Sequence, residues 1–319
     1  MNVLAIVGPT GGGKSALAVA LCQRLGGELI SCDSMQIYRG MDVGTAKPTE
    51  EEQRTVPHHM IDIRDPKESF SCADYVAEAT KVIEDCQGRG RLPVICGGTG
   101  LYLDALLRGG DLSENTTSEA LRDELLSLAQ TEGNEALWQE LNRVDPVSAQ
   151  ATHPNNVKRV IRALEIFRLS GIPKSEWDRR SREVENRYHA LVIGLRYPER
   201  DLLYHRIDRR VDQMFDMGLV EETRRLMEAG VFAVNRTAAA AIGYKELLPY
   251  LSGEESGDAA RERLKIATRH YAKRQMTWFQ AKPFVRWLDM TENGREKTFE
   301  EIVNNAEELF QNWERCDKI

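Results

Sequence analysis

Short apolar runs alternate with helical patterns along the first hundred residues. The apolar runs cover residues 3–7, 28–32, 60–63 and 92–96, and a later one covers 190–195. Apolar positions recur at helical spacing between them, over 16–25 and 72–86, and again over 101–107 after a glycine-rich turn. Buried strands that alternate with amphipathic helices are typical of a parallel sheet covered by helices. The pattern therefore predicts an α/β fold.

The pattern changes after residue 111. No convincing strand is present up to about residue 187, and apolar residues recur at helical spacing, as at Leu121, Leu125 and Leu128. This stretch predicts a mainly helical insertion. We therefore expect a first part of the α/β core at 1–111, a helical insertion domain at 112–188, and a return to the core at 189–319. Helices dominate this last part, with one short apolar run at 284–288.

The composition is that of an ordinary soluble protein with a sizeable core, at 319 residues, 41% hydrophobic and 29% charged. The first apolar run lacks a basic lead and is far too short for a membrane span, so it predicts a strand and not a signal peptide. The six cysteines show no CxxC spacing. Reduced thiols in the cytoplasm are therefore expected, and a zinc site is not.

Charge is unevenly distributed, although the net value is −7. Residues 111–152 carry nine acidic and two basic residues, whereas 153–188 carry nine basic and five acidic ones. Residues 261–282 carry seven basic residues and one acidic residue. Basic faces of this kind can follow a phosphate backbone even on an acidic protein. On charge alone, solvated helix faces explain them more simply.

A phosphate-binding pattern of the form GxxxxGK[ST] follows the first predicted strand and precedes the first predicted helix. It consists of Gly8, Pro9, Thr10, Gly11, Gly12, Gly13, Lys14 and Ser15. The order strand, loop, helix lets successive backbone N–H groups and a helix N-terminus converge on an oxyanion. Lys14 would reach a terminal phosphate, and the Ser15 hydroxyl would hold Mg²⁺. The pattern most often binds a nucleotide, but it does not show whether the bound phosphate belongs to a nucleotide or to another ligand.

Two further segments follow predicted strands. Asp33 follows 28–32, and in a parallel sheet ligands bind beyond the carboxyl ends of the strands. Its carboxylate could ligate Mg²⁺ through water, accept a proton or cap the next turn. Thr99 lies in the glycine-rich turn at 97–100, which suits an anion, a base or a plain tight turn. His58 and His59 beside Asp62 do not predict a metal site, because adjacent residues of an extended segment point to opposite sides.

A set of motifs spans most of the chain, at residues 8–15, 30–42, 44–48, 57–59, 97–102, 206–214, 241–246 and 272–279. By these motifs, in this order, the chain resembles the tRNA dimethylallyltransferases. The resemblance implies a P-loop NTPase-like core with a parallel sheet. Gly12 departs from the pattern, since a serine or valine is expected there. The zinc-finger extension of some eukaryotic relatives is not part of this sequence, which implies the bacterial-type form.

The resemblance also implies a reaction. The family moves a dimethylallyl group from its diphosphate to N6 of adenosine 37, 3′ to the tRNA anticodon. The leaving diphosphate would be held by the loop at 8–15, by Mg²⁺ on Ser15 and by Arg210 from the 206–210 cluster. Asp33 is the expected base toward the amine, because it follows a strand beside the phosphate loop. Thr99 is the next catalytic candidate. Without the resemblance, a salt-bridged helix face explains the arginine cluster as well.

RNA contacts are expected from three regions of a chain that we expect to act as a monomer. The first comprises Asp33, Ser34, Met35, Gln36 and Thr99, where Gln36 and Met35 suit hydrogen bonds and apolar contact to a flipped base. The second is the insertion, through Arg122, Lys158, Arg159, Val160, Ile161 and Arg162. The third is the late basic segment, through Lys273, Arg274 and Gln275, with Arg269 nearby.

Two other classes of protein share the same phosphate loop. A small-molecule or nucleoside kinase would use it with ATP, and Asp33 would then be the base toward a hydroxyl. The sequence shows no obvious lid segment, and a helical insertion with a basic end better fits a macromolecular substrate. A nucleotide-switched RNA-binding protein is the other alternative, but no NKxD-like motif that reads guanine is present.

Overall fold

The computed structural model describes residues 2–109, 118–183, 186–292 and 294–316. The chain divides into two compact units. The first unit joins residues 1–107 to 188–319, and the second comprises 108–187. Among the described residues, no helix is both long and apolar enough to cross a membrane.

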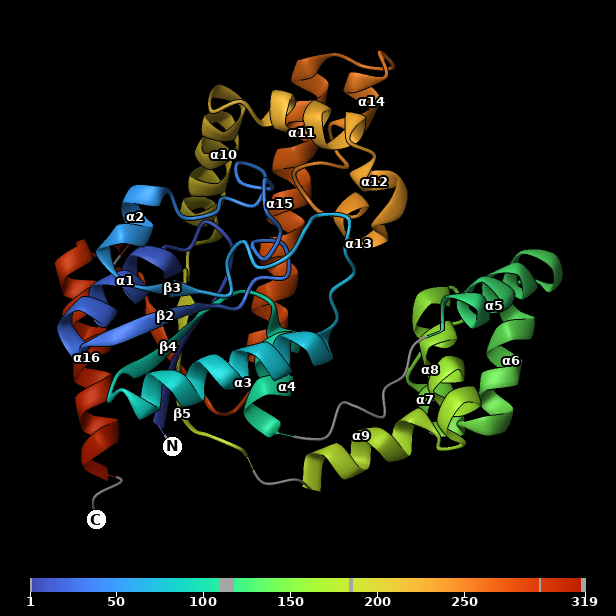
Figure 1. The fold of residues 1–319 in the computed structure, drawn as a ribbon, viewed down its shortest axis with the longest axis horizontal. Coiled ribbons are helices and arrows are strands. Elements are labelled where there is room, and N and C mark those ends of the chain that lie inside the picture. The colour runs from blue at the N-terminus through green and yellow to red at the C-terminus, as the bar shows by residue number, and fades with distance from the viewer. Residues whose placement is uncertain (1, 110–117, 184–185, 293, 317–319) are drawn as a thin grey trace. The chain divides into compact units, whose positions relative to one another are not determined.

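A parallel sheet forms the centre of the first unit. Within the described residues it has six strands in the order β3-β2-β4-β1-β5-β6, and every neighbouring pair is parallel (Figure 1). The strands are β1 (Asn2–Val7), β2 (Gly27–Ser31), β3 (His58–His59), β4 (Leu92–Gly97), β5 (His189–Arg196) and β6 (Val285–Asp289). A separate antiparallel pair joins β7 (Thr291–Glu292) to β8 (Arg295–Glu296). The sheet confirms the α/β fold expected from the sequence.

One predicted strand was placed wrongly. The strand expected at 60–63 lies just before that range, as β3, where His58 and His59 pair with Leu29 and Ile30 of β2. Met60 and Asp62 have positive φ values of 62° and 56°, a left-handed conformation that cannot continue a strand. The apolar run at 284–288 forms β6, which adds the edge strand beside β5.

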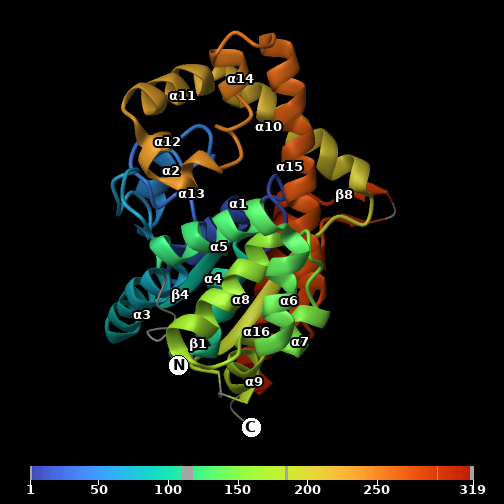
Figure 2. The same cartoon turned by 90° about the vertical axis from the view of Figure 1, so that its right-hand side faces the viewer.

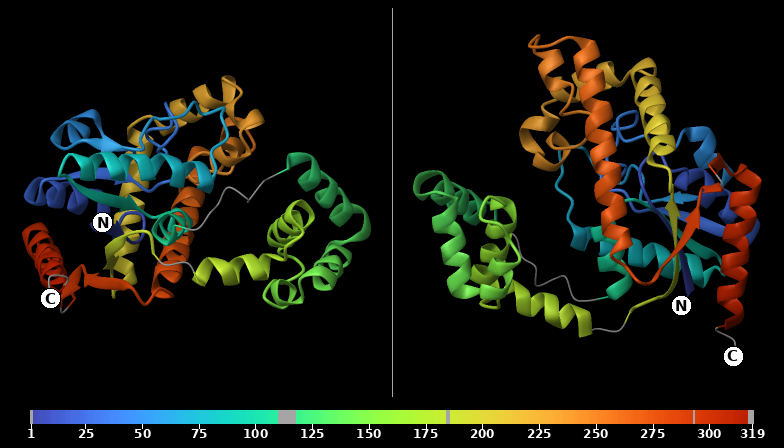
Figure 3. Two further views of the ribbon diagram at one scale, coloured as in Figure 1. Left: turned by 60° about the horizontal axis from the view of Figure 1, so that its bottom comes forward. Right: turned by 180° about the vertical axis from the view of Figure 1, so that it is seen from behind.

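Helices cover both faces of the sheet. The chain moves from β1 to β2 in one direction across the sheet and from β3 to β4 in the other. Right-handed crossovers therefore place α1 (Lys14–Leu25) and α3 (Cys72–Gly88) on opposite faces. Helix α16 (Phe299–Cys316) packs against α1 and also against β5 and β6 (Figures 1 and 3). Helix α4 (Gly100–Arg108) follows β4.

The core between α1, α16 and the sheet is apolar and closely packed. Leu17 and Leu21 of α1 and Phe310 of α16 pack with Leu4, Ile6 and other inward-facing strand residues. Full burial of a leucine side chain contributes about 2 kcal/mol. Two glycines bound α1, and Gly26 ends it in the left-handed conformation that helix C-termini favour.

The remaining helices of the first unit follow β5, apart from the short α2 (Glu50–Thr55). Figure 2 shows most of them gathered at one end of the unit, around the long helix α15. They are α10 (Arg200–Asp216), α11 (Leu219–Glu228), α12 (Val231–Val234), α13 (Arg236–Ala239), α14 (Leu248–Leu251) and α15 (Gly257–Gln280). Helices α10 and α15 pack against each other, so residues far apart in the sequence meet there.

The second unit has a core of its own. Its described helices are α5 (Glu119–Glu132), α6 (Asn134–Val144), α7 (Pro146–Gln150), α8 (Val157–Ser170) and α9 (Lys174–Glu183). Leu125, Leu137, Leu141 and Leu164 are fully buried among them, which explains the helical spacing of leucines in this part of the sequence. Asp145 caps α7 by accepting a hydrogen bond from the Ser148 N–H.

The last residue of β4 tests how closely the sheet is packed. A Cβ atom at Gly97 would collide with the backbone carbonyl of Cys32, which cannot rotate away. We predict that Gly97→Ala lowers the free energy of unfolding by about 1–3 kcal/mol in urea titrations. Gly88→Ala is the matched control, because a Cβ there meets no atom within 4 Å. Equal stability of the two variants would contradict this prediction.

Candidate active site

Three neighbouring strands bring the segments singled out in the sequence together. Strand β4 pairs with β1 on one side and with β2 on the other. The phosphate loop follows β1, Asp33 follows β2 and Thr99 follows β4. Because carboxyl ends of parallel strands meet at one edge of a sheet, the three segments lie side by side there.

The phosphate loop has the expected backbone geometry. Gly11 and Gly13 have φ values of 73° and 87°, which favour glycine, and the loop leads directly into α1 at Lys14. The Lys14 ammonium donates a 2.7 Å hydrogen bond to the carbonyl oxygen of Pro9. The lysine thus folds back over its own loop, where an anion can replace the carbonyl as its partner.

Two later helices brace this loop. Arg206 on α10 donates from Nε to the Gly11 carbonyl at 3.1 Å. On α15, the Gln275 side chain accepts a 2.8 Å hydrogen bond from the Thr10 N–H and donates a 3.2 Å bond to the Gly98 carbonyl. Gln275 is buried and its amide joins the two loops. Gln275 thus supports the site from within, and the contact with RNA expected of it from the sequence stays a prediction.

The strand-end segments that carry Asp33 and Thr99 are hydrogen-bonded to each other. The Thr99 N–H donates to the Cys32 carbonyl at 3.2 Å, and Thr99 Oγ1 accepts from the Ser34 N–H at 3.2 Å. Asp33 Oδ1 accepts from the backbone N–H groups of Met35 (2.8 Å) and Gln36 (3.4 Å). Asp33 therefore caps its turn with one oxygen. Among the described residues, its hydrogen bonds leave Oδ2 available for another role.

Gln36 and Arg210 meet at one backbone carbonyl. The Gln36 amide nitrogen donates to the Thr45 and Ala46 carbonyls, each at 3.3 Å, while its oxygen accepts from the Ser31 hydroxyl at 3.0 Å. Arg210 on α10 donates to the same Ala46 carbonyl at 3.4 Å. The segment around Ala46 thus orients two residues that the sequence assigned to substrate binding.

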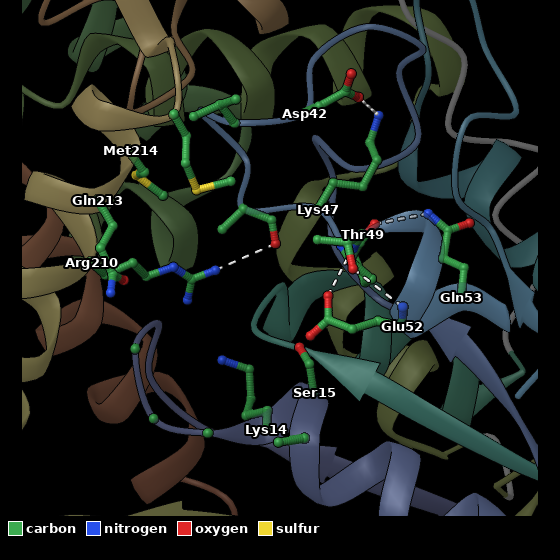
Figure 4. A pocket seen from close by; sticks show the side chains of 18 of the residues that line it. Lys14, Ser15, Asp42, Lys47, Thr49, Glu52, Gln53, Arg210, Gln213 and Met214 are labelled. Carbon is green, nitrogen blue, oxygen red and sulfur yellow. Dashed lines mark hydrogen bonds and ion pairs between the residues drawn. The ribbon is translucent and has the colours of Figure 1, made fainter. Parts of the chain in front are cut away.

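A cavity of about 710 Å³ opens above the phosphate loop (Figure 4). Lys14, Ser15 and Arg210 reach into it from α1 and α10. The remaining lining residues come from the loop, the start of α1, α2 and its preceding segment, the segment after β3, and α10 with the residue that follows it: Gly11, Gly12, Gly13, Ala16, Asp42, Val43, Ala46, Lys47, Pro48, Thr49, Glu50, Glu52, Gln53, Asp62, Arg206, Arg209, Gln213, Met214 and Met217. Lys47 is paired with Asp42 and Asp62, so the cations left to meet a ligand come from α1 and α10.

Burial lowers the pKa values of two cations in this cavity, Lys14 and Arg210. It lowers the pKa of Lys14 to about 8, against the opposing effects of Cys96 and Asp33, and Arg210 lowers it further. Burial also lowers the pKa of Arg210, and the Asp33 and Glu52 carboxylates oppose this. An anionic ligand between Lys14 and Arg210 would stabilise both charges.

The cavity also offers a donor set that fits Mg²⁺. The Ser15 hydroxyl is exposed at its floor, and the carboxylates of Asp42, Glu50, Glu52 and Asp62 line its side. Mg²⁺ prefers oxygen ligands, keeps several waters and binds through few protein groups together with ligand phosphates, and the hydroxyl of a phosphate loop is one such group. The described residues contain one group of nearby His, Cys and carboxylate ligands, Glu28, His59 and Cys86, but Arg89 already occupies both oxygens of Glu28.

Helix α15 explains the glycines after β4. A Cβ at Gly98 would collide with the Gln275 side chain, and one at Gly100 would collide with Trp278. These glycines thus allow α15 to pack closely, which the sequence alone did not indicate.

Sequence reasoning also missed Tyr271 on this helix. Burial and the nearby Asp33 raise its pKa, opposed by side-chain hydrogen bonds with Thr99 and Gln275. Lys273 and Arg274 are exposed on the same helix.

The second unit separates its predicted RNA-binding residues into three groups. Lys158 and Arg159 are exposed at the start of α8. Arg122 and Arg162 form ion pairs with the buried carboxylate of Glu165, at 2.9 and 2.6 Å. Val160 and Ile161 are buried at 0% and 8% exposure in the core of the unit. Helix α8 directs both side chains inward, and their contact with RNA stays a prediction.

Comparison with known proteins agrees with this geometry. Residues 36–282 match the model of the family described as IPP transferase. The tRNA dimethylallyltransferase of Halalkalibacterium halodurans is 48% identical over 303 residues, which cover 95% of this chain and 96% of that protein.

Solved structures lead to the same family. The full-length tRNA isopentenylpyrophosphate transferase of Bacillus halodurans superposes with a TM-score of 0.72 at 44% identity, over 100% of this chain and 99% of that one. A eukaryotic dimethylallyltransferase acting on tRNA gives a TM-score of 0.81 at 29% identity, over 98% of this chain and 80% of that one. This chain therefore belongs to the IPP transferase family, the family of the tRNA dimethylallyltransferases.

Proposed function

We propose that this protein transfers a dimethylallyl group from dimethylallyl diphosphate to N6 of adenosine 37 in tRNA, 3′ to the anticodon. The observation that carries the proposal is the adjacency of a phosphate loop and a strand-end carboxylate, on the neighbouring strands β1, β4 and β2. A leaving diphosphate in the loop would place the reacting carbon next to Asp33.

In this proposal, the phosphate loop and its cations hold the leaving group. Backbone N–H groups at the start of α1, the Lys14 ammonium and the Arg210 guanidinium would bind the diphosphate, whose negative charge grows as its bond to carbon breaks. Arg206 keeps the loop in place through the Gly11 carbonyl. Mg²⁺ on the Ser15 hydroxyl would supply further charge neutralisation when bound.

Asp33 would handle the proton of the amine. The N6 lone pair attacks C1 of the dimethylallyl group, the bond between C1 and the diphosphate oxygen breaks, and one N6 proton passes to Asp33. The Oδ1 hydrogen bonds from Met35 and Gln36 fix the carboxylate, which leaves Oδ2 to receive this proton. Thr99 lies beside it on the β4 loop, where its hydroxyl can orient the amine.

The tRNA would be held by basic residues of both units. Lys158 and Arg159, together with Arg122 and Arg162, are proposed to contact phosphates of the anticodon stem-loop, as are Lys273 and Arg274 on α15. The protein is proposed to act as a monomer. Five of the six free cysteines are at least partly buried, which suits a reducing compartment such as the cytoplasm.

The proposed reaction and the role of Asp33 are tested in one assay. Label from dimethylallyl diphosphate should move to unmodified tRNA, and label from the γ-phosphate of ATP should not. Asp33→Asn should lower the transfer rate by about 10²- to 10⁴-fold, because the base is lost, while tRNA binding is retained.

Asp65→Asn is the matched control for Asp33→Asn. Asp65 is exposed and accepts a 2.9 Å hydrogen bond from the Lys67 N–H two residues on, as Asp33 does from Met35. This control should transfer at the rate of the unaltered protein. Transfer of label from ATP alone would refute the proposed function, and full activity of Asp33→Asn would refute the role of its carboxylate.

Binding of dimethylallyl diphosphate should depend on pH through Lys14. Because burial lowers its pKa to about 8, Lys14 loses its charge as the pH rises through that value. We predict that the dissociation constant, measured by calorimetry without tRNA, rises above pH 8 by up to about tenfold per pH unit. Lys14→Met should bind weakly at every pH and lose this dependence. If the dissociation constant of Lys14→Met still rose above pH 8, the pH dependence would belong to another group.

The contribution of the second unit can be measured through salt dependence. Lys158→Ala together with Arg159→Ala should weaken tRNA binding and reduce the slope of log K against log salt by about 1 to 2, because phosphate contacts release counterions. Arg143→Ala is the control, since Arg143 is an exposed arginine on α6 of the same unit. Equal slopes for all three proteins would exclude these phosphate contacts.

A further inference from the structure

The carboxylate of Glu222 binds the backbone of residues 42–44, in a segment that lines the cavity. Glu222 on α11 is 7% exposed. Its Oε2 accepts hydrogen bonds from the backbone N–H groups of Asp42 (3.0 Å) and Val43 (2.9 Å). Its Oε1 accepts from the Gly44 N–H (3.0 Å) and from the Tyr244 hydroxyl (2.8 Å). Successive N–H groups that converge on an anion form a nest, and here the anion is a side chain of the protein.

Close packing adds to this attachment. A Cβ at Gly44 would lie 2.5 Å from the ring of Tyr244, and one at Gly243 would lie 2.8 Å from the Gly44 carbonyl oxygen. Gly243 also has a φ of 109°, which favours glycine. The segment from Asp42 to Gly44 is therefore docked against Glu222 and Tyr244 in a position that larger residues would not allow.

The other side of the same segment faces the site. Asp42, Val43, Ala46 and Lys47 line the cavity (Figure 4). The Ala46 carbonyl accepts hydrogen bonds from Arg210 at 3.4 Å and from the Gln36 amide at 3.3 Å. A displacement of the segment at its Glu222 end would move this carbonyl. The guanidinium of Arg210 would then lose the partner that directs it across the cavity.

We propose that Glu222 is a positioning residue for donor binding. It fixes residues 42–47 so that the Ala46 carbonyl orients Arg210 toward the diphosphate. The inference rests on the proposed function, because it takes the occupant of the cavity to be the diphosphate of the donor. Glu222 itself lines no part of the cavity among the described residues, and it acts through the backbone that it binds.

The substitution Glu222→Gln tests this role with little change in shape. All four groups that surround the carboxylate donate hydrogen bonds to it. A glutamine has only one acceptor oxygen, and its NH₂ group would face N–H or O–H groups that are donors themselves. Hydrogen bonds to charged groups are worth about 1.5–3 kcal/mol, so we expect KM for dimethylallyl diphosphate to rise about 10- to 100-fold. KM for tRNA should stay within about twofold, since that substrate contacts other residues.

Asp145→Asn controls for loss of stability alone. Asp145 is 1% exposed in the second unit and accepts hydrogen bonds from the backbone N–H groups of Ser148 (3.0 Å) and Ser175 (2.9 Å). This variant should also have a lower Tm, but its KM for dimethylallyl diphosphate should not change. Kinetics are measured at a temperature where circular dichroism shows every variant folded.

A double-mutant cycle shows whether the effect passes through Arg210. In an Arg210→Ala background, Glu222→Gln should change KM for dimethylallyl diphosphate by less than about threefold, because the group that it orients is gone. Additive effects of the two substitutions would overturn the proposal, as would unchanged donor KM in Glu222→Gln or an equal rise in Asp145→Asn. If the unaltered protein itself transferred no dimethylallyl group, the proposed function would fail instead.

Discussion

The parallel pairing of β4 with β1 and β2 determines the geometry of the site. Its register sets Val7 opposite Gly97 and Ser31 opposite Cys96, so the three strands end together. Each following segment then leaves the sheet at the same edge: the phosphate loop, the turn of Asp33 and the loop of Thr99. A shift of one residue in this register would reverse the faces of the buried strand residues, so the core also maintains the site.

The part of the site that is formed before residue 100 depends on helices that follow much later in the chain. Arg206 and Arg210 on α10 and Gln275 on α15 act on a loop and on strand ends formed before residue 100. Burial lowers the pKa of Lys14 and of Arg210, because it makes both cations more costly to keep charged without an anionic partner. The same burial strengthens attraction to an anion, because the lower dielectric screens it less than water does.

The second unit uses charge differently. Glu165 is fully buried and is neutralised by Arg122 and Arg162 and by a 2.9 Å hydrogen bond from the Ser118 N–H. Because a buried charge is costly without partners, these arginines are needed within the fold. Lys158 and Arg159 are exposed on the same unit, and they remain the stronger candidates for phosphate contacts.

Features that depend on the local order of residues could be predicted from the sequence. The phosphate loop, the carboxylate after β2 and the helical nature of the second unit follow from short patterns, since backbone conformation and side-chain periodicity are local properties. The residues that support these features became known only from the folded chain. It placed β3 at His58–His59, buried Val160 and Ile161, assigned Gly98 and Gly100 to the approach of α15, and brought Glu222 to the Gly44 segment. Each of these depends on contacts between residues distant in sequence, which no local pattern encodes.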